Sequence, residues 1–108
     1  MLIELLLIAA QPQNNVEPVV APMVDWVVCY TSATDRFASQ PESADTVATA
    51  VLGACEAEES RLKDAIYLIV PRPTTAEVEA HMAMLRDNAR RHILGVIFQT
   101  RTARSRGN

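Results

Sequence analysis

Glycine is scarce in this sequence, since only Gly53, Gly95 and Gly107 occur among 108 residues and they lie far apart. Glycine-rich phosphate loops and the sharp turn that presents a catalytic serine both need several glycines within a few positions. The sequence contains neither pattern. The scarcity therefore argues against nucleotide-binding loops and against hydrolases that depend on such a turn.

Aromatic residues are also few. There are five of them, Trp26, Tyr30, Phe37, Tyr67 and Phe98. Alanine is plentiful, and it has the best intrinsic helix propensity, whereas glycine is costly inside helices. Composition therefore predicts an all-α fold, and the length of 108 residues predicts one domain. In a domain with so few rings, Trp26 and Tyr67 are expected to fill the core rather than to act as exposed anchors.

Positive charge is missing from the apolar N-terminal segment, residues 1–10. This segment has about the length of a signal-peptide core and ends in two alanines, where cleavage could occur. It is too short to span a bilayer, which needs about 20 apolar residues. No Lys or Arg precedes it, and Glu4 interrupts it. We expect a signal-like leader and an exported protein; the alternative is a cytosolic chain with an apolar N-terminal arm.

A spacer and three helices are expected after the leader. Residues 11–22 contain three prolines and are predicted to form the spacer. Apolar residues then recur at helical spacing in three segments. The predicted helices cover residues 23–38, 43–70 and 75–103, within one domain of residues 23–103.

Prolines and caps separate the predicted helices. Proline disfavours helix in the residue before it, so Pro41 ends the first helix and Pro71 ends the second. Thr74 and Glu77 form a capping-box pattern at the start of the third helix. Residues 93–100 would suit a strand equally well, but a lone strand would have no partner, so we favour helix. Residues 104–108 are expected to form a basic tail.

The chain has only two cysteines, Cys29 and Cys55. Cys29 lies nine residues before Ala38, and Cys55 lies twelve residues after Ser43. In an antiparallel hairpin their heights would differ by only about 4–5 Å, at a rise of about 1.5 Å per residue. Their Cα atoms could then reach the separation that a disulfide requires. We predict a Cys29–Cys55 disulfide; the alternative is two buried, reduced cysteines that pack as small hydrophobic groups.

No catalytic, cofactor-binding or metal-binding group stands out. His81 and His92 are eleven residues apart, about 16 Å along a helix, and cannot share an ion. Glu77 and His81 could supply two ligands, but no third is evident nearby. Cys29 and Cys55 lack the Cys-x-x-Cys spacing of redox sites. We therefore expect no enzyme activity and no cofactor.

Charge is divided unevenly along the chain. The last 29 residues hold six arginines against one acidic residue, Asp87, whereas the preceding part is strongly acidic. The arginines form a candidate interaction surface for an acidic protein face or an anionic lipid; they are Arg86, Arg90, Arg91, Arg101, Arg104 and Arg106. The alternative is that they pair with the acidic second helix and complement the helix dipole. Nucleic acid is not expected as a partner, because the whole chain is acidic.

Residues 25–66 resemble a segment of small exported bacterial proteins of unknown function. The resemblance rests on Cys29-Tyr30, on the alanine-rich stretch that begins at Ser43, and on Ala54-Cys55-Glu56. Those proteins pair a short apolar leader with two helix-borne cysteines. The resemblance implies a bacterial envelope setting, and no activity is known for that group.

The sequence thus predicts a small non-enzymatic helical protein, periplasmic or secreted, that binds an envelope protein or an anionic surface. One alternative is an inhibitor or immunity-type protein that neutralises an enzyme. Another is a cytosolic helical dimerisation domain. The mature protein is expected to have no transmembrane span, and its oligomeric state is left open.

Overall fold

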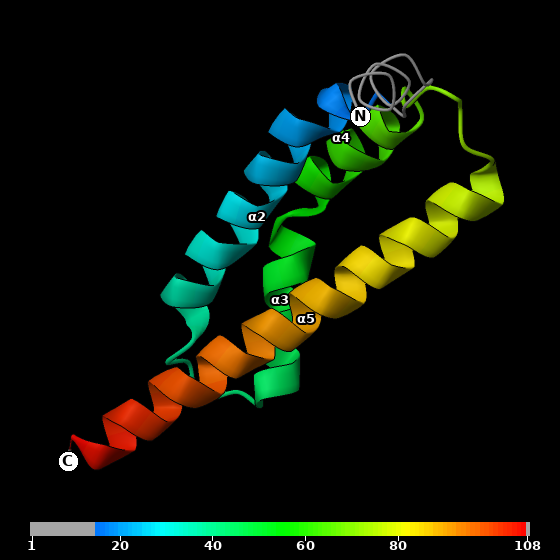
Figure 1. Ribbon diagram of the computed structural model, residues 1–108. Coiled ribbons are helices and arrows are strands. Elements are labelled where there is room, and N and C mark those ends of the chain that lie inside the picture. The colour runs from blue at the N-terminus through cyan, green and yellow to red at the C-terminus, as the bar shows by residue number, and fades with distance from the viewer. Residues whose placement is uncertain (1–14, 108) are drawn as a thin grey trace, which may run out of the picture.

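The computed structural model describes residues 15–107, and every regular element in that range is a helix. In chain order the helices are α2 (Glu17–Phe37), α3 (Ala44–Ala54), α4 (Glu56–Ile66) and α5 (Thr75–Arg106), as Figure 1 shows. The all-α prediction is confirmed, and residues 93–100 are helical. The predicted leader, residues 1–10, lies outside the described residues.

Helix α2 begins within the predicted spacer, so the spacer prediction is wrong for residues 17–22. Two of the prolines that suggested a spacer lie in the first turns of this helix. Pro18 occupies the first turn, where backbone N–H groups have no intrahelical acceptor and a missing N–H costs little. Pro22 lies inside the helix and removes one intrahelical hydrogen bond.

The predicted helix over residues 43–70 is two helices. Cys55 ends α3 and begins α4, and its φ of −108° and ψ of 20° are not helical. Its N–H donates to Leu52 O, while its carbonyl accepts from Glu59 N, so this one residue makes a backbone hydrogen bond to each helix. The break lets α3 and α4 follow different directions, and α4 packs chiefly against α2 while α3 also contacts α5.

Helix α5 has 32 residues and is about 48 Å long at the usual helical rise. Its N-terminus carries the predicted capping box: Glu77 N donates to Thr74 Oγ1 at 3.1 Å, and Thr74 N donates to Glu77 Oε1 at 2.9 Å. The helix runs to Arg106, so most of the predicted basic tail is helical. Figure 1 shows its C-terminal end extending beyond the α2–α3 turn.

A single core joins the four helices. It is built from apolar side chains that recur along the inner face of each helix: Trp26, Tyr30, Ala33, Val47, Val51, Leu62, Ile66, Val78, Met82, Ala89, Ile93 and Ile97. Trp26 is 2% exposed and packs edge-on against Tyr30, with ring centroids 5.1 Å apart. The prediction that Trp26 fills the core is confirmed; Tyr67 lies half-buried at its edge.

The described part of the chain is elongated. Its extents are 63 × 33 × 20 Å and its radius of gyration is 18.4 Å, compared with about 13 Å for a compact domain of 100 residues. Among the described helices, none combines the length and the apolar character needed to cross a membrane. Because the described part is elongated and thin, much of each helix surface faces outward.

Candidate interaction surface

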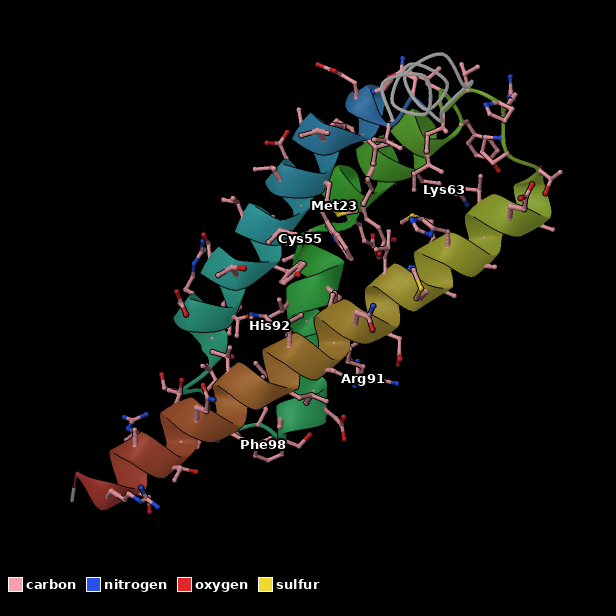
Figure 2. All side chains as sticks on the ribbon, viewed as in Figure 1. Met23, Cys55, Lys63, Arg91, His92 and Phe98 are labelled. Atoms are coloured by element: carbon pink, nitrogen blue, oxygen red, sulfur yellow. A yellow bond between two sulfur atoms is a disulfide. The ribbon has the colours of Figure 1, made fainter. Side chains whose placement is uncertain are left out.

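The two cysteines form the predicted disulfide. Cys29 projects from α2 towards Cys55 at the α3–α4 junction, with an S–S distance of 2.11 Å and a Cα–Cα distance of 5.9 Å. Cys55 is completely buried, and Figure 2 labels it at the junction, beside α2. The bond therefore ties α2 to the break between α3 and α4.

One group of candidate metal ligands occurs within residues 15–107, and it contains this disulfide. The two sulfur atoms and a carboxylate oxygen of Glu58 lie within 4.8 Å of one another. A cysteine binds a metal ion or acts as a nucleophile through its thiolate. Because both sulfurs are bonded to each other, this group cannot perform either chemistry while the disulfide is intact.

Two of the six arginines in the candidate surface connect α5 to α4 and α3. Arg86 Nε donates to Glu59 Oε1 on α4 at 3.1 Å. Arg90 reaches the first two turns of α3, where it donates to Asp45 Oδ1 at 3.0 Å and to Thr49 Oγ1 at 3.2 Å. These contacts match the alternative interpretation, in which the basic third helix pairs with the acidic second segment.

Lys63 and Glu79 extend the same line of contacts towards the start of α5. They form an ion pair between α4 and α5. The hydrogen bond between them raises the pKa of Lys63 and lowers the pKa of Glu79. Both groups are on the surface, so the pair is expected to add at most about 1 kcal/mol to stability.

Two further arginines hold the turn between α2 and α3. Arg101 Nη2 donates to the backbone carbonyls of Gln40, at 2.8 Å, and Glu42, at 2.6 Å. Arg104 Nη1 donates to Ser39 O at 3.3 Å. Carbonyls at the end of a helix and in the following turn lack helical partners and carry partial negative charge, so they favour a cation.

We expect Arg101→Gln to lower the free energy of unfolding by about 1–2 kcal/mol, because it removes charge-assisted bonds to backbone carbonyls. Arg106→Gln is the matched control. Arg106 is exposed in the last turn of the same helix, and its replacement should have little effect. Urea unfolding of both variants measures the difference. Equal stabilities would contradict a structural role for Arg101.

Arg91 and Arg106 make no contact with another helix or turn among the hydrogen bonds and ion pairs of the described residues, and both are exposed. The Arg91 side chain is 74% exposed and pairs with Asp87 one turn earlier on α5 (Figure 2). The structure therefore does not gather the six arginines into one free basic patch. Four of them contact other segments of the chain, Arg91 pairs with Asp87 within α5, and Arg106 lies in the last turn of the same helix.

A pocket of about 390 Å³ lies where α4 ends and α5 begins. Three of its lining side chains are charged or polar, namely Arg72, Glu77 and His81. The others are apolar: Ile66, Ile69, Pro71, Pro73 and Val78. Arg72 lies over the Tyr67 ring at 5.7 Å. The hydrogen bond from the Thr74 backbone lowers the pKa of the Glu77 carboxyl. Arg72 and Glu77 are thus already engaged in local contacts.

The most distinctive exposed feature is a row of valines on α2. Val16, Val20, Val24 and Val28 follow one another at intervals of four residues, and each is 53–57% exposed. We call these four residues the valine row. Residues at this spacing share one side of a helix. Single exposed valines are common on protein surfaces, whereas contiguous apolar patches often mark interaction sites.

Sequence reasoning missed this row because residues 16–22 were assigned to a spacer. Once the helix is known to begin at Glu17, the repeat of valine at every fourth position becomes visible as a stripe. The stripe that was recognised, through Met23, Trp26 and Tyr30, faces the core. The helix therefore carries two apolar stripes, of which one is buried in the core and the other is exposed.

Comparisons with known proteins give no family: no family model, no curated protein and no solved structure matches the chain. The resemblance to small exported bacterial proteins therefore stays a prediction.

Proposed function

We propose that the protein is a non-catalytic binding module, periplasmic or secreted, that recognises a protein partner through the valine row of α2. The observation that carries the proposal is the row itself, in which Val16 at the N-cap of α2 is followed by three valines on successive turns of the helix, all four about half exposed. A helix that lays an apolar stripe against a partner is a common mode of protein recognition.

Charge supports a protein partner over an anionic surface. The exposed charged residues of α2 are acidic in excess: they are Glu17, Asp25 and Asp35 against Arg36, and such an excess opposes binding to anionic lipid. Helices that lie on membranes usually carry Lys and Arg on the polar face. Most of the arginines that could have supplied positive charge are occupied by contacts within the chain.

The disulfide supports the proposed compartment. Disulfides persist in oxidising environments such as the periplasm and the extracellular space, and they are rare in the cytosol. The chain is also thin, with only part of each helix buried, so a covalent tie between α2 and the α3–α4 junction is useful to it.

Photocross-linking in cells tests the proposal. A photoreactive phenylalanine analogue in place of Val28 should give a cross-linked protein adduct, because Val28 lies on the proposed contact surface. The same analogue in place of Met84, which is similarly exposed on α5, is the matched control. We expect an adduct from position 28 and none from position 84. The absence of any adduct from position 28 would reject the proposed function.

A further inference from the structure

The Cys29–Cys55 disulfide has a carboxylate beside it. An oxygen of Glu58 and the two sulfur atoms lie within 4.8 Å of one another, where α2 meets the α3–α4 junction. Thiolates and carboxylates are both zinc ligands, and three protein ligands with one water molecule complete a tetrahedral zinc site. We infer that these three side chains bind one zinc ion when the disulfide is reduced, so that the ion takes the place of the covalent bond.

The backbone holds the three ligands at suitable positions. In a tetrahedral site with Zn–S distances of about 2.3 Å, the two sulfur atoms lie about 3.8 Å apart. Sulfur atoms that are no longer bonded separate to about this distance, because van der Waals contact prevents a closer approach. The Cα atoms of Cys29 and Cys55 are 5.9 Å apart, so rotation of the two side chains is sufficient. Glu58 follows Cys55 by three positions and therefore lies on the same side of α4.

The electrostatic surroundings also suit the ion. Two thiolates and one carboxylate leave the loaded site with one net negative charge, which the N-terminus of α4 favours. Glu58 has one competing partner, Arg61, at 3.4 Å. The Arg61 side chain is 60% exposed, and an ion pair on the surface contributes little, so zinc can displace it. Cys55 is completely buried and the other two ligands are partly buried, so protein encloses the ion on the side of the core.

The disulfide and the zinc ion exclude each other. A dithiol reductant gives two electrons and two protons to the sulfur atoms and becomes a disulfide itself. Zinc then binds to the two cysteines and releases both thiol protons. Only the reduced chain has thiolates to offer, so the oxidised protein has no site of this kind.

The zinc form gives this thin fold a cross-link under reducing conditions. Small domains with little core are commonly held together by a disulfide or by a structural metal ion. The chain is synthesised with free thiols, and the cytosol keeps thiols reduced. The ion therefore ties α2 to the α3–α4 junction before the disulfide forms.

Zinc titration of the full chain, reduced with a phosphine, tests the inference. The reduced protein should bind one zinc ion per chain, and the disulfide-bonded protein should bind none at the same concentrations. With zinc about 100-fold above its dissociation constant, the Tm of the reduced protein should rise by about 10–20 °C. If the reduced protein bound no zinc, or one ion for every two chains, the inference would be overturned.

Glu58→Gln distinguishes the three-ligand site from binding by the two thiolates alone. We expect this variant to bind zinc at least about tenfold more weakly. Glu56→Gln is the matched control, because it makes the same change in charge in the same turn of α4 at an exposed position outside the group. Its affinity should equal that of the unaltered protein. An unchanged affinity in Glu58→Gln, or an equal loss in both variants, would overturn the assignment of Glu58 as a ligand and with it the inferred site.

Discussion

Replacing both cysteines, by Cys29→Ala and Cys55→Ala, should lower the free energy of unfolding by about 3.5 kcal/mol. The two residues are 26 positions apart, and a cross-link over that span removes about this much chain entropy from the unfolded state. For a domain of this size the loss corresponds to a decrease in Tm of about 15–25 °C. Thermal unfolding followed by circular dichroism measures it.

The control for this prediction is the response to reductant. Reduction should lower the Tm of the unaltered protein towards that of the double variant, and it should leave the double variant unchanged. A decrease in Tm below about 5 °C would mean that packing alone holds α2 against the α3–α4 junction. The disulfide would then have little structural importance.

The second large effect is expected at Leu62, whose side chain is completely buried between α4 and the rest of the core. Leu62→Ala should lower the free energy of unfolding by about 3 kcal/mol, because it removes buried apolar surface and leaves a cavity. In a small domain that is a large share of the total stability. Urea unfolding measures the change from the shift in midpoint at constant m-value.

Leu68 provides the matched control for this change, because it is 64% exposed just beyond the same helix. Leu68→Ala should alter the free energy of unfolding by less than about 0.5 kcal/mol. If the two variants were equally stable, α4 would not pack against α2 and α5 as the structure describes. The pair therefore tests the orientation of α4 around its axis.

The features that the sequence predicts well are those that depend on local spacing. The capping box at Thr74 and Glu77 needs only two residue types three positions apart, and it forms as expected. The disulfide prediction used only the distances of Cys29 and Cys55 from the turn, and these set their heights in any antiparallel hairpin. Both arguments hold without knowledge of the remaining fold.

Proline and alanine misled the prediction of helix boundaries. Pro18 and Pro22 suggested a spacer, yet a helix tolerates proline in its first turn and can absorb one further lost hydrogen bond when tertiary packing supports it. The stretch before Cys55 was read as continuous helix because it is rich in alanine, although Gly53, two residues before the break, lowers its helix propensity locally. The break allows α3 and α4 to pack against different neighbours, and that depends on residues far away in the sequence.

The candidate interaction surface was the least predictable feature. The sequence shows six arginines near the C-terminus, but the carboxylates and carbonyls that they contact lie 27 to 65 positions earlier in the chain. Arg101 could face a partner or the α2–α3 turn of the same chain, and the direction in which α5 crosses α2 and α3 decides between the two. The valine row, in contrast, became recognisable as soon as the start of α2 was known.

The central claim is that the Cys29–Cys55 disulfide, which joins α2 to the α3–α4 junction, holds this thin fold together in the cell. Mass spectrometry of the protein isolated with a thiol-alkylating reagent, before and after reduction, tests it most directly. The account predicts no alkylated cysteine before reduction and alkylation of both Cys29 and Cys55 afterwards. Alkylation of both residues without reductant would contradict the claim, and with it the proposed compartment.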